Sequence, residues 1–317
     1  METHGLRKEY GRKVAVANLS LGVSAGEVFG FLGPNGAGKS TTVKMLVGLV
    51  RPTAGGGSLL GRPLGDVSAR RHLGFLPEQF RFHEWLRAEE FLDFHASLYG
   101  VPPRERGRRI ADVLQLVGLE ARAQDTLRTF SKGMLQRIGI AQAVIADPQL
   151  VILDEPTSAL DPIGRRDVRD LIRGLRTRGI AVFLNSHLLS EVEMICDRVV
   201  IIDRGMVIHQ GRVADLVAGT LEAELRLDSV PPALLAALEA RWLVQRNTHP
   251  APERPTDVLS GPDAAGLWTL RVVLQEEADL PHVADLAIRH GARLHALIPH
   301  RTTLEDLFVT SVENHDR

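Results

Sequence analysis

Cysteine is nearly absent from this chain of 317 residues, because Cys196 is its single thiol. An internal disulfide is therefore excluded, which fits a reducing compartment. Long apolar runs are missing too: no stretch approaches the about 18 residues that a membrane-spanning helix needs. The first residues also lack the charged-then-apolar pattern of a secretion signal. We therefore expect a soluble chain, and any role at a membrane would depend on a partner.

An excess of charge of one sign is also lacking. The chain has 38 Lys and Arg residues against 39 Asp and Glu residues, which gives a formal net charge of −1. Neither a basic field for nucleic acid nor an acidic solvating tail is indicated, so we expect no nucleic-acid partner. The length and the 44% of hydrophobic residues suit two domains, each with its own core.

The most informative segment is 33–40, which reads Gly33, Pro34, Asn35, Gly36, Ala37, Gly38, Lys39 and Ser40. This is the pattern G-x-x-x-x-G-K-S, placed between an apolar stretch of strand length at 28–32 and helix-spaced apolar residues at 41–49. Glycines let the backbone wrap closely around an anion, and N–H groups at the helix start face it. Lys39 would supply charge to the outer phosphates and Ser40 a hydroxyl to Mg²⁺. Thr41 follows directly and is counted among the candidate phosphate-binding residues. A chance glycine-rich turn is the alternative, which the strand–loop–helix context disfavours.

A second signal is a buried strand that ends in two carboxylates. Residues 150–153 form a continuous apolar run, typical of a strand covered on both faces, and Asp154 and Glu155 follow it. This places both carboxylates at the carboxyl edge of the sheet, where ligands bind. Asp154 would hold Mg²⁺ directly or through water, and Glu155 would polarise an attacking water as a general base. Acidic residues often follow strands in solvated turns, so the interpretation depends on the pairing with the phosphate loop.

Two further signals are weak when taken alone. Ser131, Lys132, Gly133 and Met134 open a helical segment, where a small hydroxyl and a glycine can form an anion site. An ordinary capped helix explains the same residues. His187 follows the apolar strand at 183–186, from which a histidine can reach a γ-phosphate, although a lone histidine is more often a satisfied polar residue.

Together, these elements make residues 1–215 resemble the nucleotide-binding subunit of an ATP-binding-cassette transporter. The resemblance rests on five segments in order: 33–40, 131–133, 154–155, 158–161 and His187. It implies an α/β P-loop ATPase domain with a mainly parallel core sheet, an antiparallel β subdomain and a helical subdomain at about 80–146. It also implies ATP and Mg²⁺ as cofactors, Tyr10 as the aromatic that stacks on adenine, Asp161 at a subunit contact and His187 as the switch histidine.

The chain departs from the family pattern at two places. The signature usually reads Leu-Ser-Gly-Gly-Gln, whereas this chain has Phe130-Ser131-Lys132-Gly133-Met134. This variant is similar to the branch of drug, lipid and other type-2 exporters. The second departure is the loop that normally offers a glutamine to Mg²⁺, where Glu78 stands with Gln79 beside it. Either residue could supply the oxygen ligand.

The resemblance implies partners as well. In the family, two copies pack head to tail, so that ATP would lie between Lys39 of one and Ser131 of the other. Opening and closing of this homodimer would drive export, of a drug, a lipid or another small hydrophobic substrate, through a separate integral-membrane permease. The chain would then be cytoplasmic and peripheral on the cytoplasmic face of the membrane.

Other functions remain open at this point. A soluble ATPase of the same superfamily, acting on nucleic acid or ribosomes, usually carries paired cassettes, coiled coils or zinc clusters that this chain lacks. A nucleotide-sensing module is disfavoured by the presence of Glu155 and His187. A small-molecule kinase would need an acceptor site and an arginine-bearing lid, and neither is evident.

The remainder of the chain, 216–317, is expected to form a small α+β accessory domain. Its residues 303–308 resemble the ending that many exporter ATPases carry after a second domain. This domain could aid dimerisation, regulate activity or simply stabilise the protein.

Overall fold

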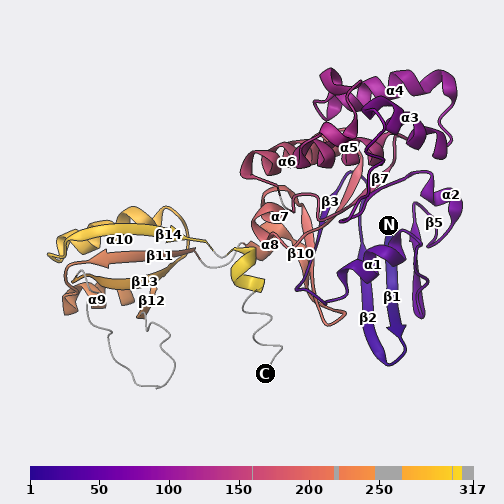
Figure 1. Ribbon diagram of the computed structural model, residues 1–317. Coiled ribbons are helices and arrows are strands. Elements are labelled where there is room, and N and C mark those ends of the chain that lie inside the picture. The colour runs from indigo at the N-terminus through magenta and orange to yellow at the C-terminus, as the bar shows by residue number, and fades with distance from the viewer. Residues whose placement is uncertain (159, 218–220, 247–265, 302, 309–317) are drawn as a thin grey trace. The chain divides into compact units, whose positions relative to one another are not determined.

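A computed structural model describes residues 1–158, 160–217, 221–246, 266–301 and 303–308 (Figure 1). Ala159, in the loop at 158–161, lies outside these described residues. The described chain divides into two compact units, Met1–Val213 with Phe308, and Ala214–Leu307. No helix among the described residues combines the length and the apolar composition that a membrane span requires.

The first unit is built on a ten-stranded sheet with the strand order β5-β4-β1-β2-β10-β9-β3-β8-β7-β6. Its strands are β1 (Glu2–Tyr10), β2 (Lys13–Gly22), β3 (Val28–Leu32), β4 (Ala54–Leu59), β5 (Arg62–Pro63), β6 (Leu73–Leu76), β7 (Leu150–Asp154), β8 (Ala181–Asn185), β9 (Arg198–Asp203) and β10 (Met206–Arg212). β1 pairs antiparallel with β2 and with β4, so the antiparallel β subdomain is present as predicted.

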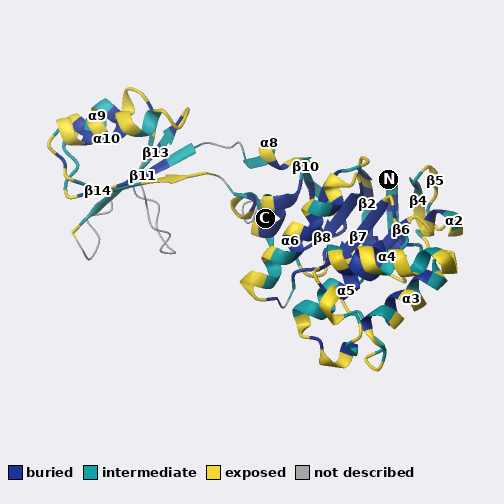
Figure 2. Cartoon of the chain, turned by 90° about the horizontal axis from the view of Figure 1, so that it is seen from above, coloured by how far each residue is buried: buried dark blue, intermediate teal, exposed yellow. Residues whose placement is uncertain are grey.

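The centre of this sheet is parallel. β9, β3, β8, β7 and β6 pair in that order in the same direction. Every residue of β3, β7 and β8 is buried, because helices cover both faces of these apolar strands (Figure 2). Since the strands run the same way, the segments that leave their carboxyl ends all emerge at one edge of the sheet.

The helices of the first unit connect these strands. They are α1 (Lys39–Leu46), α2 (Val67–Arg70), α3 (Ala88–Leu98), α4 (Pro103–Leu116), α5 (Lys132–Val144), α6 (Pro162–Thr177) and α7 (Leu189–Ile195). A short helix, α8 (Val213–Val217), begins at the last residue of this unit and continues into the second unit. α3, α4 and two short 3₁₀ turns lie between β6 and α5 and form the predicted helical subdomain (Figure 1). Pro102 and Pro103 separate α3 from α4, since Pro103 takes the first helical position of α4, where its missing N–H is tolerated.

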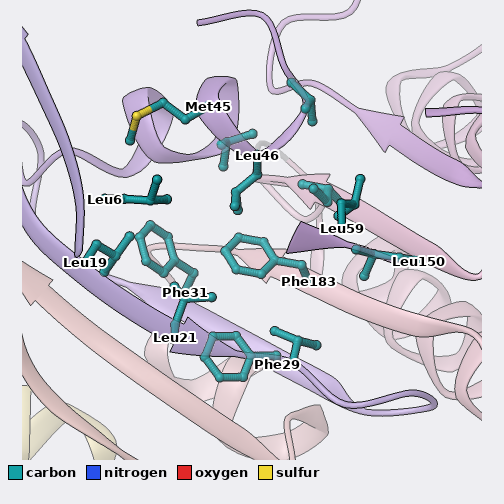
Figure 3. Close-up of a cluster of buried hydrophobic side chains, with 14 of the residues drawn as sticks. Leu6, Leu19, Leu21, Phe29, Phe31, Met45, Leu46, Leu59, Leu150 and Phe183 are labelled. Atoms are coloured by element: carbon teal, nitrogen blue, oxygen red, sulfur yellow. The ribbon is translucent and has the colours of Figure 1, made fainter. Parts of the chain in front are cut away.

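An aromatic cluster fixes the strand that leads into the phosphate loop. The ring of Phe183 in β8 packs against Phe29 and Phe31 of β3 at centroid distances of 5.8 and 5.3 Å (Figure 3). Met45 and Leu46 of α1 join the same buried cluster. Burial of each such side chain contributes about 1.5–3 kcal/mol. The cluster therefore holds β3, β8 and α1 together, and the loops at their ends with them.

The second unit has a four-stranded antiparallel sheet with the order β12-β13-β11-β14. Its elements are β11 (Leu221–Leu227), α9 (Pro232–Glu239), β12 (Leu243–Arg246), β13 (Trp268–Leu274), α10 (Asp279–Arg289) and β14 (Leu294–His300). Alternate residues such as Ala223, Leu225 and Val272 share a core with Leu234 of α9 and Val283 of α10. This unit is therefore α+β, with its core between the helices and the sheet.

Candidate nucleotide site

The phosphate loop connects β3 to α1 and needs glycine at defined positions. Gly36 and Gly38 have φ angles of 85° and 104°, a region that favours glycine. A Cβ on Gly38 would lie 2.4 Å from the carbonyl oxygen of Ala15, and a Cβ on Gly33 would lie 2.4 Å from that of Ile202. The loop is thus closely wrapped between neighbouring strands, with its last residues leading into the N-terminus of α1. This is the geometry that presents backbone N–H groups to a phosphate.

Lys39, the first residue of α1, folds back over this loop. Its Nζ donates hydrogen bonds to the carbonyl oxygens of Gly33, at 2.6 Å, and Pro34, at 3.2 Å. Burial lowers the pKa of Lys39, and the charges of Glu155, Asp154 and Glu78 oppose this effect. The ammonium is therefore held inside the loop with carboxylates nearby, as a phosphate-binding cation would be.

Asp154 ends β7 and lies beside the end of β8. Its partner in the strand register is Asn185, whose Nδ2 donates to Asp154 Oδ1. Burial raises the pKa of Asp154, and the hydrogen bond from Asn185 opposes the shift. The other side-chain atom of Asn185, Oδ1, is buried and has no hydrogen-bond partner among the described residues. Asn185 is not among the site residues predicted from the sequence. Its position at the end of the next buried strand after Asp154 could have identified it as a candidate site residue.

Glu155 and His187 meet directly, as the sequence alone could not establish. Glu155 has a φ of 54°, and its N–H donates to the carbonyl oxygen of Asn185 at 2.8 Å. His187 Nδ1 lies 2.7 Å from Glu155 Oε2. The Glu155 side chain is 9% exposed and that of His187 is 53% exposed. Burial raises the pKa of Glu155, and His187 opposes the shift. The pair can therefore offer a carboxylate oriented by an imidazole that faces solvent.

Glu78 comes two residues after β6, the strand that pairs with β7. It therefore emerges beside Asp154, and its charge raises the pKa of Asp154 while opposing the fall in the pKa of Lys39. Gln79 is exposed, like Glu78. Of these two candidates, Glu78 is the one whose charge acts on Asp154 and Lys39.

Three residues here can offer oxygen to a cation: Ser40, the second residue of α1, and the carboxylates of Asp154 and Glu78, which interact with each other electrostatically. Such hard oxygen ligands suit Mg²⁺, which commonly binds one or two carboxylates together with substrate phosphates. Within the described part of the chain, no group of three or more His, Cys, Asp or Glu residues could hold a metal ion by itself. The residues present therefore fit an ion that takes further oxygen ligands from a bound phosphate.

The signature segment begins α5, with Ser131 as its N-cap. Ser131 Oγ accepts a hydrogen bond from Met134 N at 3.3 Å. A hollow of about 390 Å³ lies against this helix start, and it is lined by Ser131, Lys132, Gly133, Met134, Arg137, Leu160, Asp161, Ile163, Gly164 and Asp167. Asp161 caps α6 through its Oδ1, which accepts from Gly164 N at 2.7 Å. Among the described residues that line this hollow, none comes from the phosphate loop. The structure thus brings the signature to Asp161 and not to Lys39.

Tyr10 ends β1 at the tip of the hairpin with β2. Tyr10 is 49% exposed, and Lys8 Nζ lies 5.1 Å from the ring centroid. β2 carries Ala15, whose carbonyl oxygen lies against Gly38, so this hairpin borders the phosphate loop. Stacking of Tyr10 on an adenine stays a prediction that this exposure allows.

Comparison with known proteins identifies the family. Residues 16–158 match the family model described as "ABC transporter". An uncharacterized ABC transporter ATP-binding protein of Nostoc is 38% identical over 323 residues, covering 99% of this chain and 90% of that protein. The linearmycin resistance ATP-binding protein LnrL of Bacillus subtilis is 38% identical over 247 residues, covering 76% of this chain and 79% of that protein. A relative from Synechocystis is 49% identical over 201 residues, which span 63% of this chain and 57% of the relative.

A solved structure agrees with these relatives. It is a dimeric post-hydrolysis state of the ATP-binding cassette MJ0796 bound to ADP and Pi. It matches with a TM-score of 0.61 at 25% sequence identity, over 67% of this chain and 98% of that one. The predicted P-loop ATPase fold is thereby confirmed. The chain belongs to the ABC transporter family, as an ATP-binding subunit whose cassette hydrolyses ATP.

Proposed function

We propose that this protein powers export through a separate membrane permease by ATP-driven association of two copies. The observation that carries the proposal is the division of the nucleotide-binding elements between two places. Lys39, Asp154 and Glu155 surround the phosphate loop, whereas Ser131 faces a hollow lined by other residues. Each copy therefore offers half of a composite site, and a second copy supplies the other half.

Hydrolysis would take place at Glu155. Its buried carboxylate is held by His187 Nδ1 at 2.7 Å, and its elevated pKa makes it a better proton acceptor than an exposed glutamate. Glu155 would accept a proton from the attacking water, while His187 holds the carboxylate in position. Lys39 and the loop N–H groups would stabilise charge on the transferred phosphoryl group.

Mg²⁺ would be held by Ser40 and Asp154, with Glu78 as the additional oxygen ligand. When bound, the ion would neutralise phosphate charge and orient the nucleotide. Asn185 fixes the Asp154 carboxylate through its Nδ2, so that the carboxylate is oriented before any ion arrives. Tyr10 would stack on the adenine, and Thr41 would complete the phosphate contacts.

Head-to-tail association would bring Ser131, Lys132, Gly133 and Met134 of one copy onto the triphosphate bound by the other. Ser131 and Lys132 lie exposed at the N-terminus of α5, and a helix N-terminus suits an anion. Asp161 lies in the same hollow and would contact the second copy beside the phosphate. Loss of the γ-phosphate after hydrolysis would remove this bridge and allow the two copies to separate.

The permease would dock beside the loop at Glu78 and Gln79. The residues that follow this loop expose an apolar surface, with Trp85 74%, Phe94 43% and Leu98 67% exposed. Exposed apolar patches of this kind commonly mark protein contacts. Docking here would place the permease next to the loop that carries Glu78, so that nucleotide binding and permease movement are coupled. The protein would then act at the cytoplasmic face of the membrane.

Export of a drug, a lipid or another small hydrophobic compound is the transport function we favour. The relative LnrL is named for linearmycin resistance, and it shares 38% identity over 76% of this chain. The Lys132 and Met134 variant of the signature supports the same branch. The cargo itself would be selected by the permease.

Replacement of Glu155 by glutamine tests the proposal, because it preserves the shape of the side chain and removes the base. We expect kcat for MgATP hydrolysis to fall by about 10²–10⁴-fold. ATP binding should persist, so gel filtration with MgATP should show a stable dimer. Glu120→Gln, at an exposed position in a 3₁₀ turn, is the matched control and should behave as the native protein does. A Glu155→Gln protein that hydrolyses ATP at the native rate, or that stays monomeric with MgATP, would refute the proposal.

A further inference from the structure

Three arginines on one face of α6 reach toward the helix that follows His187. Arg169, Arg173 and Arg176 are spaced by four and three residues, so they lie along the same side of the helix. Arg169 contacts Glu191 in the first turn of α7, and Arg173 contacts the last turn of α7. Arg176 contacts Asp197, the residue that follows the C-cap of α7. We call these three residues the arginine ladder.

Arg169 makes the most buried of these contacts. Its Nη1 donates to both carboxylate oxygens of Glu191, at 2.7 Å each. The Arg169 and Glu191 side chains are 16% and 7% exposed, so solvent screens this ion pair little. Glu191 is a charged residue in the first turn of α7, where a lone buried carboxylate would be unfavourable. Arg169 therefore supplies a cationic partner to a carboxylate that is buried at this position.

The other two members of the ladder extend the contact along α7. Arg173 Nη2 donates to the carbonyl oxygen of Met194 at 3.4 Å. Arg176 Nη2 lies 2.6 Å from Asp197 Oδ1. Asp197 Oδ2 in turn accepts from the backbone N–H of Val28 at 3.0 Å, at the start of β3. The ladder thus ties α7 to α6 along its length and anchors its far end to the strand that leads into the phosphate loop.

Each of the two helices joined in this way follows a residue of the nucleotide site. α6 begins directly after Asp161, which caps it and lies in the hollow at the signature. α7 begins two residues after His187, whose Nδ1 contacts Glu155. His187 itself is half exposed, so the position of its ring depends on how firmly α7 is held. The ladder is therefore the side-chain connection between the Asp161 loop and the switch histidine.

We propose that Arg169, supported by Arg173 and Arg176, is a positioning residue for His187. It fixes α7 so that His187 Nδ1 stays on Glu155 Oε2, and it makes α6 and α7 move together when the Asp161 loop contacts a second copy. The proposal rests on the proposed function, in which Glu155 is the base and Asp161 is a subunit contact. Arg169 would not contact the nucleotide or the attacking water, and it would affect hydrolysis only by holding His187 in position.

The test uses the full chain with three variants. Arg169→Met keeps the stem of the side chain and removes its charge. Arg169→Met with Glu191→Met removes both charges, so that no unpaired carboxylate is left buried and the protein folds even if the single variant does not. Arg166→Met is the matched control, an exposed arginine on the same helix. Each is measured for kcat and KM with MgATP, for Tm, and by ¹⁵N NMR of the His187 Nδ1 resonance, assigned with His187→Gln.

We expect kcat to fall about 10–100-fold in both Arg169 variants, because small displacements of catalytic groups have effects of this size. KM should stay within about twofold, since the phosphate loop is untouched. The His187 Nδ1 resonance should move toward that of a solvent-exposed ring. The double variant should recover Tm without recovering kcat, and Arg166→Met should match the native protein in every measurement.

A purely structural role for the ladder predicts a different pattern. If kcat stays within twofold of native, recovers together with Tm in the double variant, or falls while the His187 resonance is unchanged, the positioning role is wrong. Glu155→Gln separates this failure from that of the proposed function. If Glu155→Gln abolishes hydrolysis while Arg169→Met does not impair it, only the present inference fails. If Glu155→Gln leaves hydrolysis intact, the proposed function fails as well.

Discussion

Replacing Gly38 by alanine adds one methyl group to the phosphate loop at a position where the structure leaves no room for it. The new Cβ would lie 2.4 Å from the carbonyl oxygen of Ala15 and 3.3 Å from Val16 Cγ2. Both atoms belong to β2, which is held in the sheet, so the loop or the strand must shift. In addition, the φ of 104° is one that alanine rarely adopts. Two separate penalties therefore fall on this one substitution.

The two penalties can be given a size. A backbone conformation of this kind costs about 1–3 kcal/mol for a residue with a Cβ. Overlap with a fixed neighbour adds about 1–3 kcal/mol. Gly38→Ala should therefore lower the free energy of unfolding of the first unit by about 2–6 kcal/mol. For a unit of this size, the Tm should fall by roughly 5–20 °C.

Alanine substitutions at two other glycines separate the cost of the backbone conformation from the cost of the steric overlap. Gly36 has a φ of 85° with no atom within 4 Å of a built Cβ, so Gly36→Ala carries the backbone penalty alone, about 1–2 kcal/mol. Gly174 lies inside α6 with open space around it and no positive φ, so Gly174→Ala should stabilise by about 0.5–1 kcal/mol.

The assay is thermal unfolding followed by circular dichroism, together with titration of a fluorescent ATP analogue. Gly38→Ala should bind the analogue more weakly than Gly36→Ala does, because the loop must open to relieve the contact with Ala15. Equal Tm values for Gly36→Ala and Gly38→Ala, together with native affinity in both, would refute this reasoning.

Three further outcomes are expected. Burial lowers the pKa of His95 to about 4, and His83 acts in the same direction, so the unfolded chain binds a proton before the folded one. The contribution of His95 to the free energy of unfolding should thus be fully present above about pH 6.5 and be lost as the pH drops toward 4. His95→Phe should flatten the Tm–pH profile in that range. An unchanged slope would assign the acid sensitivity to other groups. Burial also raises the pKa of Cys196, so its thiol should react with a disulfide reagent at least ~100-fold more slowly in the native protein than in urea, even at pH 9; rapid native labelling would contradict its burial. Phe183→Ala should lower the free energy of unfolding by about 3–5 kcal/mol in a denaturant titration of the first unit, and a loss below about 1 kcal/mol would mean that the cluster with Phe29 and Phe31 does not support the sheet.

Local signals explain why much of the cassette could be predicted from the sequence. The phosphate loop is a contiguous pattern whose glycines, lysine and flanking strand and helix are all neighbours in the chain. The fully apolar run before Asp154 likewise identifies a strand covered on both faces, and the structure buries every residue of β7. Such elements follow from backbone sterics and periodicity, so they can be recognised without knowing what packs against them.

The sequence alone could not decide whether Glu78 or Gln79 lies beside Asp154. Both residues of the pair follow the same strand, and their order in the chain does not say which faces Asp154. The register of β6 against β7 places the end of this strand beside that carboxylate, and the charge of Glu78 acts on the pKa of Asp154. A strand register is a property of the sheet and not of one segment.

The sequence by itself determined which chemical groups this protein has and which of them stand at the ends of strands and helices, because capping, glycine conformation and apolar periodicity act between near neighbours. The tertiary structure alone decided that Asn185 holds Asp154, that His187 lies on Glu155, and that Arg169 reaches Glu191. Each of these contacts joins residues more than twenty positions apart. Their geometry depends on how the parallel strands align and how α6 and α7 pack, which is fixed only when the whole core of the first unit is buried at once.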